Sequence, residues 1–330
     1  MLIELLIGLL VILIGAEFFT NGIEWLGYRL GLSEGAVGSI LAAVGTALPE
    51  SIIPIVAILF SQEPNTSHIG IGAILGAPFM LGTLALFFTG VSARCFTWRG
   101  RGVRILSVDT QIITRDLSVF VIMYSLALAV SLSERAIVHQ VTAVALVLAY
   151  LSYVIVTLKS GGQLAGDDLK PLYCWFWCKP GIFPIIFQVL AALGLIIWGA
   201  NFFVQGINSL ADIMGISSMI LALVIAPIAT ELPEKFNSVI WIAQRKDTLA
   251  LGNITGAMVF QSSVIPAFGM LFTPWQLNGI ALLSGMLVIA SIMIIIWKLH
   301  SNKTLYTSSL IFSGIFYAIF IGFIIWGVRG

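Results

Sequence analysis

Two short stretches of the sequence place a proline beside a carboxylate inside long apolar runs. The first is GTALPESI, residues 45–52, and the second is ATELPEKF, residues 229–236. A proline lacks the backbone N–H and clashes with the carbonyl one turn earlier, so it frees carbonyl oxygens close to the acid. Carbonyl, hydroxyl and carboxylate oxygens together suit a hard cation such as Ca²⁺. The chemistry indicated is cation binding.

The two glutamates of these stretches, Glu50 and Glu234, are the expected metal ligands. A carboxylate at mid-bilayer costs about 2.5–3.5 kcal/mol on insertion scales, so an acid retained there indicates function. Thr46 and Thr230 lie four residues before these acids and therefore on the same helical face. The other expected cation-binding residues are Glu231, Asn253 and Gln261, and the residues expected to modulate charge or coupling are Lys235 and Glu17.

Each of these candidates also has a structural alternative. The prolines could serve only to kink the helices for packing, with each acid in a structural hydrogen bond. Lys235 could neutralise the acidic cluster or occupy the place of a transported ion, or it could pair with Glu231 or extend toward the interface. Asn253 and Gln261 could join neighbouring helices by hydrogen bonds. For Glu17 both kinds of role stay open.

The composition places these residues in a membrane protein. Of 330 residues, 59% are hydrophobic and 9% are charged, against about a quarter charged in soluble domains. The net charge of +1 and the lack of a dense basic tract argue against a nucleic-acid partner. No nucleophile–base set or phosphate loop indicates an enzyme, and no cofactor is implied. The expected partners are membrane lipid and inorganic cations, and no protein partner is evident.

Ten stretches are long and apolar enough to span a bilayer, which takes about 20 residues as a helix. We therefore expect an all-α integral membrane protein, with the helices of spans two and seven broken at their prolines. The stretches are residues 2–28, 34–60, 67–92, 112–132, 136–158, 182–208, 217–243, 248–272, 276–298 and 306–328.

The basic residues indicate the orientation of these spans. Thirteen Lys and Arg residues fall in the odd-numbered connections or in the span ends next to them, and two fall in the even-numbered connections and termini. Because cytoplasmic loops collect Lys and Arg, both termini are expected outside the cell. A prokaryotic plasma membrane is the expected location, as the short loops suggest a prokaryotic source.

The chain contains an internal repeat. Residues 15–50 align with residues 199–234 without a gap at an offset of 184, and GAILGA from Gly72 matches GNITGA from Gly252. Five spans in each copy make the second copy enter from the opposite side, as in secondary transporters with inverted repeats. The expected division is a first repeat, 1–158, a short cytoplasmic connection, 159–181, and a second repeat, 182–330.

These motifs resemble the paired alpha-repeats of the sodium/calcium exchanger, or cation/calcium antiporter, superfamily. The resemblance rests on GAEFF and GTALPES in the first repeat, GANFF and ATELPEK in the second, and GIGAILGAPF with LGNITGAMVF. It implies a ten-span antiporter in which Glu50 and Glu234 are the central Ca²⁺ ligands and Thr46 and Thr230 assist. It also implies that spans one and six slide for alternating access.

The sequence departs from the family pattern where family members usually complete their sodium sites. These positions hold Ala47, Glu231, Ala77, Ala257, Leu81 and Gln261. Three functions therefore stay open. The chain could be an antiporter that uses H⁺ in place of some or all Na⁺, or an ordinary Na⁺/Ca²⁺ exchanger with carbonyl or water ligands. It could also be a sensor, partner subunit or transporter of another solute on the same scaffold.

Overall fold

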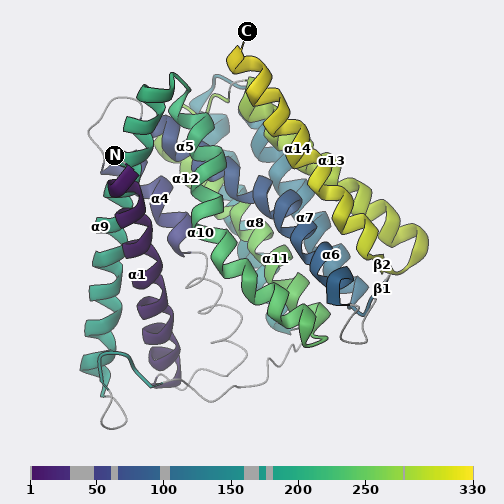
Figure 1. The fold of residues 1–330 in the computed structure, drawn as a ribbon, viewed down its shortest axis with the longest axis horizontal. Coiled ribbons are helices and arrows are strands. Elements are labelled where there is room, and N and C mark those ends of the chain that lie inside the picture. Colours follow the sequence, from purple (N-terminus) through teal and green to yellow (C-terminus); the bar gives the residue numbers. More distant parts are fainter. Residues whose placement is uncertain are drawn as a thin grey trace. The chain divides into compact units, whose positions relative to one another are not determined.

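The computed structural model describes residues 2–29, 48–60, 66–96, 105–159, 171–175, 181–277 and 279–329, without the side chains of residues 2, 27–28, 48–49, 158–159, 232–237 and 327–329. The fold is helical apart from one two-stranded ribbon (Figure 1). The elements are α1 (Leu2–Arg29), α4 (Leu48–Leu59), α5 (Thr66–Met80), the π-helical segment η2 (Leu81–Ala85), α6 (Leu86–Cys95), β1 (Ile105–Leu106), α7 (Thr110–Val130), α8 (Ala136–Lys159), α9 (Ile182–Met214), α10 (Ser218–Ala243), α11 (Asp247–Gln261), α12 (Val264–Phe272), α13 (Gly279–Asn302), β2 (Leu305–Tyr306) and α14 (Thr307–Arg329).

Each predicted span overlaps a helix of the described residues, and the second span does so only from residue 48 onward. Eight helical stretches in the described residues have the length and composition to cross a membrane. The two shorter apolar helices are Glu50–Leu59 and Ser218–Glu231, in the second and seventh predicted spans. Helix α4 includes the first LPE motif, and α10 includes the second.

Local sequence signals account for several helix ends. The Asp109 carboxylate caps α7 by accepting hydrogen bonds from the backbone N–H groups of Gln111 and Ile112, at 2.9 and 3.2 Å. Helix α9 ends at Gly215, whose φ of 63° is left-handed and costs a glycine little. Between these signals the helices are held mainly by packing of their apolar side chains.

The chain forms two compact units. The first comprises residues 1–70 and 148–218, and the second comprises residues 71–147 and 219–330. Each unit therefore takes segments from both predicted repeats. The predicted boundaries at 158 and 182 describe sequence copies, whereas the units describe packing.

In the first unit, α1 and α9 form an antiparallel pair in close backbone contact. A Cβ added at Gly8 would lie 2.6 Å from the backbone N of Phe203, and one at Gly15 would lie 3.2 Å from the carbonyl O of Ala192. Small residues let helix backbones approach in this way in membrane proteins. The two helices are drawn side by side in Figure 1.

The contacts of this helix pair repeat at the offset of the sequence repeat. A Cβ at Gly199 would meet the O of Gly8 and the N of Ile12. Adding 184 to each partner gives Ala192 and Ile196, and these are the partners of Gly15, which matches Gly199. The contacts of Gly15 and Gly199 are thus exchanged by the repeat offset.

In the second unit, glycines bring α5 against α10. A Cβ added at Gly72 would lie 2.2 Å from the O of Met219, and one at Gly76 would lie 2.3 Å from the O of Leu223. At the end of α13, the ribbon pairs Ile105 with Tyr306 and so joins the connection before α7 to the connection before α14.

Two long helical stretches of this unit are irregular at matching repeat positions. The third predicted span contains η2, and the eighth is interrupted at Ser262–Ser263 between α11 and α12. The GAILGA/GNITGA match pairs Leu81, where η2 begins, with Gln261, the last residue before the interruption. Segments of π-helix often mark functional sites.

The expected break in the seventh span is not present. Helix α10 is continuous from Ser218 to Ala243 although it contains Pro227 and Pro233. Each proline removes one N–H donor, which a helix packed against neighbours can tolerate. In the second span the described helix begins at Leu48, and the expected break lies at the border of residues 30–47, outside the described residues.

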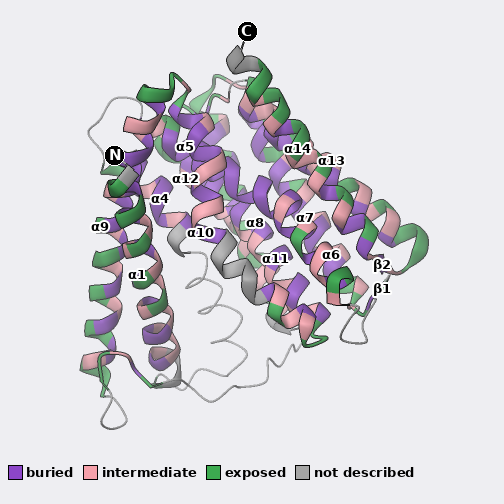
Figure 2. Ribbon diagram, viewed as in Figure 1, coloured by how far each residue is buried: buried purple, intermediate pink, exposed green. Residues whose placement is uncertain are grey.

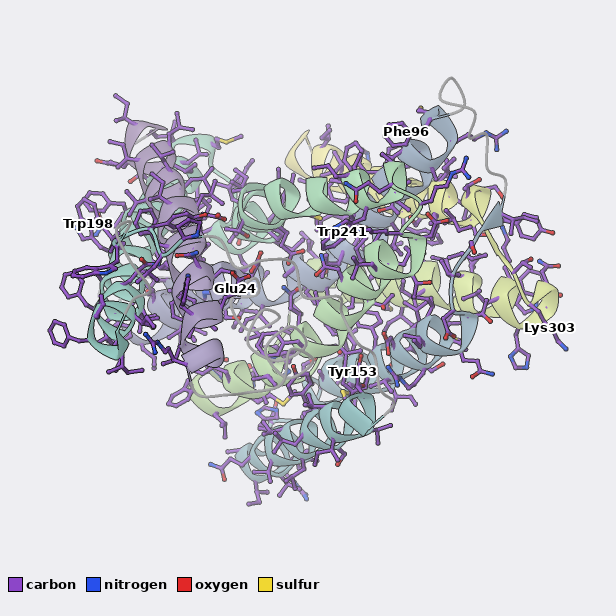
Figure 3. The ribbon with its side chains drawn as sticks, turned by 90° about the horizontal axis from the view of Figure 1, so that it is seen from below. Glu24, Phe96, Tyr153, Trp198, Trp241 and Lys303 are labelled. Carbon is purple, nitrogen blue, oxygen red and sulfur yellow. The ribbon has the colours of Figure 1, made fainter. Side chains whose placement is uncertain are left out.

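Apolar side chains cover the outer faces of several helices (Figure 2). On α9, Trp198 projects outward (Figure 3) and packs edge-on against Phe202 at a centroid distance of 5.0 Å. The 18-residue windows of α1 and α8 are 28% and 17% buried, whereas that of residues 66–95 is 83% buried. Exposed apolar faces of this extent are the expected surface of helices in contact with lipid.

Candidate cation site

Glu231 on α10 lies fully buried in the second unit. Its exposed fraction is 0%, and its carboxylate Oε1 accepts a hydrogen bond of 2.8 Å from Nε2 of Gln261. A buried carboxylate in an apolar helix is costly unless it is hydrogen-bonded. This bond joins α10 to the end of α11 and brings together two residues that the sequence indicated separately.

Gln261 presents a second polar atom at this position. Its side chain is 2% exposed, and its Oε1 is buried and accepts no hydrogen bond within the described residues. The amide is the last residue of α11, directly before the interruption at Ser262–Ser263. A buried amide oxygen beside a carboxylate is a suitable partner for a dehydrated cation or a proton donor.

Two further candidates lie on the same helices. Thr230 is buried, and its hydroxyl donates a 3.0 Å hydrogen bond to the carbonyl O of Ala226, which leaves the oxygen able to accept. Asn253 is half-buried on α11 and shares a helical face with Ala257, four residues later. In the second unit, the described oxygens of the candidate cation-binding residues therefore come from α10 and α11.

Glu50 occupies the first turn of α4 in the first unit and is 7% exposed. Pro54, four residues later, has no N–H to donate to the Glu50 carbonyl. Glu50 thus combines a buried carboxylate with a backbone carbonyl to which Pro54 cannot donate.

The third span offers no side-chain oxygen at the expected positions. Ala77 and Leu81 are both buried. The carbonyls of η2 are bound from other helices, since Ser291 on α13 donates to the O of Gly82 at 2.9 Å and Ser313 on α14 to the O of Thr83 at 2.8 Å. The irregular backbone is therefore satisfied by serine hydroxyls.

Several predicted residues lie outside what the structure describes. Thr46 and Ala47 fall in residues 30–47, and the side chains of Glu234 and Lys235 fall in the undescribed part of α10. Glu17 is described and lies exposed on α1, where its Oε1 accepts a 2.6 Å hydrogen bond from the hydroxyl of Tyr173. In the described residues, no group of three or more His, Cys, Asp or Glu side chains gathers as a metal cluster.

A buried acid that the sequence motifs did not indicate, Asp116, lies on α7. Its Oδ2 accepts a 2.9 Å hydrogen bond from Thr255 on α11, and its Oδ1 accepts two from the guanidinium of Arg115 at 2.9 and 3.1 Å. The backbone N–H of Asp109 likewise donates to the Thr248 hydroxyl at 3.1 Å. The signal was available as an adjacent Arg and Asp inside a predicted span. These bonds hold α11, the helix of Gln261, against α7.

Apolar helices of membrane-spanning length, with carboxylates buried among them, define a multi-spanning helical membrane protein. The chain belongs to the sodium/calcium exchanger protein family, whose model matches residues 2–159 and 184–328. The resemblance drawn from the paired LPE motifs is therefore confirmed, and it places the chain among membrane antiporters of cations.

Individual relatives are distant but cover most of the chain. The inner membrane protein YrbG of Escherichia coli K12 is 22% identical over 279 residues, 84% of this chain and 81% of the relative. The crystal structure of the H⁺/Ca²⁺ exchanger CAX matches 99% of this chain and 88% of its own at 16% identity and a TM-score of 0.76. The sodium-calcium exchanger NCX_Mj matches 97% and 96% at 19% identity and a TM-score of 0.58. At these identities the two structures establish the fold alone.

Proposed function

We propose that this protein is a secondary active antiporter that moves Ca²⁺ or a related cation in exchange for H⁺, Na⁺ or both by alternating access. The observation that carries the proposal is the burial of Glu50 in α4 and of the Glu231–Gln261 pair between α10 and α11. Buried oxygens on these otherwise apolar helices are ligands for a hard cation. The protein is then a transporter and not an enzyme, and it needs no cofactor.

The proposed architecture is ten spans in two inverted repeats. Support comes from the α1/α9 contacts, which recur at the offset of 184, and from the paired irregularities at Leu81 and Gln261. Support also comes from the match of one family model to two segments of similar length. Inverted repeats give a transporter two related states that open to opposite sides.

The proposed cation site has Glu50 and Glu234 as metal ligands. Thr46, Thr230, Glu231, Asn253 and Gln261 supply further oxygens, and Lys235 and Glu17 tune charge or coupling. The hydroxyl of Thr230 and the amide oxygen of Gln261 are both able to accept, which supports their place in an oxygen-rich site. The site residues come from repeat positions that the family motif defines.

We propose H⁺ as the counter-ion to be tested first. A second cation site needs several oxygen ligands, whereas Ala77 and Leu81 are buried apolar residues and Ala257 replaces another hydroxyl. Fewer oxygens leave less coordination for Na⁺. The fold likeness to the H⁺/Ca²⁺ exchanger CAX is in keeping with this choice.

The test is Ca²⁺ flux into proteoliposomes of purified protein under an imposed H⁺ gradient and, separately, under an imposed Na⁺ gradient. Flux driven by H⁺ supports the preferred coupling, and flux driven only by Na⁺ supports carbonyl and water ligands in place of the lost side chains. The variant Glu50→Gln keeps the size of the side chain and removes its charge, so we expect near-complete loss of flux.

The matched control is Glu134→Gln, because Glu134 is exposed after the end of α7 and has no place in the proposed site. We expect wild-type flux from this variant. Absence of Ca²⁺ flux under both gradients, or full flux in Glu50→Gln, contradicts the proposal and favours a sensor, a partner subunit or transport of another solute.

A further inference from the structure

Five residues of the connection between the repeats, 171–175, are held on the α1/α9 pair by two buried amide side chains. We call residues 171–175 the docked segment. The amides are Asn21 of α1, 3% exposed, and Gln188 of α9, 0% exposed. Neither residue belongs to the proposed cation site, and both lie inside predicted spans. Buried amides of this kind are retained where their hydrogen bonds are satisfied.

The two amides bind each other and the backbone of the docked segment. Gln188 Nε2 donates to the Oδ1 of Asn21 at 2.9 Å. Asn21 then accepts from the N–H of Tyr173 at 3.1 Å and donates to the O of Pro171 at 3.2 Å. The Oε1 of Gln188 accepts from the N–H of Cys174 at 2.9 Å. Two side chains thus form hydrogen bonds with three backbone groups of the segment.

Side chains of the docked segment make further contacts with α1 and α9. Leu172 is fully buried in a cluster with Trp25 and Ile185. The Tyr173 ring packs on Phe18 at a centroid distance of 5.2 Å, and its hydroxyl donates to Glu17. One leucine anchor, one aromatic contact and four hydrogen bonds to side chains of α1 and α9 make this a specific attachment. Figure 1 shows the segment as the thin teal trace at one end of the α1/α9 pair.

At the opposite end of the helix pair, the two residues at the equivalent repeat positions differ in burial from Asn21 and Gln188. At the repeat offset of 184, Asn21 corresponds to Gln205 and Gln188 corresponds to Glu4. Both Gln205 and Glu4 are exposed. The α1/α9 pair is therefore symmetric in its glycine contacts and asymmetric at its ends. The described part of the connection, residues 171–175, is bound at the end of the pair that carries Asn21 and Gln188.

We propose that Asn21 and Gln188 are positioning residues for exchange, which fasten the connection between the repeats to α1 and α9 so that this helix pair moves as one body. The inference rests on the proposed antiport function, in which one part of the protein moves against another. Release of the segment removes its three backbone partners from Asn21 and Gln188, which keep their bond to each other and the 2.8 Å bond from Gln188 to the O of Phe18. The buried amides are then only partly satisfied, which loosens the end of the pair and slows the transition. Cation binding itself is unaffected, because the amides carry no ligand.

The test combines transport kinetics with amide hydrogen exchange on the full-length protein in proteoliposomes. In Asn21→Leu we expect the maximal rate of Ca²⁺ exchange to fall by roughly tenfold while KM for Ca²⁺ is unchanged. We expect the amides of Tyr173 and Cys174 to exchange about a hundredfold faster as the segment detaches. Asn21→Asp, which keeps the acceptor for Tyr173, should recover part of the rate.

Two further variants make the test decisive. Gln205→Leu changes the repeat partner of Asn21 on an exposed face, so we expect wild-type rate and wild-type protection. Cys174→Pro removes the N–H that binds Gln188 without altering α1 or α9, so it tests detachment if Asn21→Leu fails to fold. We expect it to reproduce the loss of rate at constant KM.

The outcomes separate this inference from the proposed function. Wild-type rates in Asn21→Leu or Cys174→Pro together with fast exchange of the segment amides overturn the inference alone. Protected amides in both variants overturn it as well, because the side chains then do not hold the segment. A wild-type protein that exchanges no cation contradicts the proposed function, and the positioning role falls with it.

Discussion

Replacement of Gly8 by alanine should destabilise the first unit although alanine is the better helix former. The added Cβ would lie 2.6 Å from the N of Phe203, 2.8 Å from the O of Gly199 and 3.1 Å from the Cα of Phe203. All three atoms belong to the backbone of α9, so no side chain can turn away to make room. The two helices must move apart at the point where they are closest.

The size of the effect follows from two opposing contributions. Overpacking of a tight contact costs about 1–3 kcal/mol. Alanine in place of glycine in a helix interior returns about 0.5–1 kcal/mol. Gly194 on α9 provides the matched control, because it is exposed and a Cβ there would meet nothing within 4 Å. We therefore expect Gly8→Ala to be less stable than Gly194→Ala by about 1–3 kcal/mol.

The assay is reversible unfolding of the purified protein in mixed micelles with an increasing fraction of denaturing detergent, read as the free energy of unfolding. Glycine to alanine at both positions holds the change of composition constant, so the difference reports the α1/α9 contact. Equal stabilities of Gly8→Ala and Gly194→Ala would refute the close packing inferred for the pair.

Two further predictions concern the polar contacts outside the cation site. Thr255→Val removes the hydroxyl that donates to Asp116, and because hydrogen bonds to charged groups contribute about 1.5–3 kcal/mol, we expect a loss of that size in the same unfolding assay, and a larger loss than in Thr248→Val. An equal loss in the two variants would contradict the role of Asp116. The hydrogen bond to Glu17, followed by burial and the negative charges of Glu17 and Glu24, raises the pKa of Tyr173 to about 12. Because this is above the ordinary tyrosine pKa of about 10, the contact stabilises the fold below pH ~10 and is lost as pH rises through ~12. Phenolate absorbance should show Glu17→Gln titrating Tyr173 at lower pH than wild type, and identical titrations would exclude the bond.

The spans and the family were predictable because their signals are local or repeated. A run of about 20 apolar residues forms a helix in a bilayer, because a helix satisfies the hydrogen bonds of its backbone within the segment itself. The two LPE motifs at equivalent repeat positions indicated the family, and the match to the family model confirms it. The relation of Glu50 to the site residues of the second unit stays a prediction, as do the repeat boundaries and the orientation.

The buried polar contacts were not predictable, because they depend on which helices become neighbours. Asn21 and Gln188 are 167 residues apart, and no periodicity links them. Asp116 and Thr255 are 139 residues apart. Each looked like an isolated polar residue in an apolar span. Only packing shows that these residues form satisfied pairs, with one pair holding the connection between the repeats.

The seventh span shows why a proline alone predicts a helix break poorly. Pro227 has no N–H for the carbonyl of Leu223, four residues earlier. The backbone of Gly76 lies against that oxygen, closely enough for an added Cβ to come within 2.3 Å. A larger residue at position 76 would clash with this carbonyl and with the Pro227 ring, so the glycine is what lets α5 and α10 approach at the proline. Helix α10 continues through Pro227 although one carbonyl loses its usual donor, because a helix packed against its neighbours can tolerate that loss. A proline in an apolar span therefore marks a break only where the packing around it allows the helix to end.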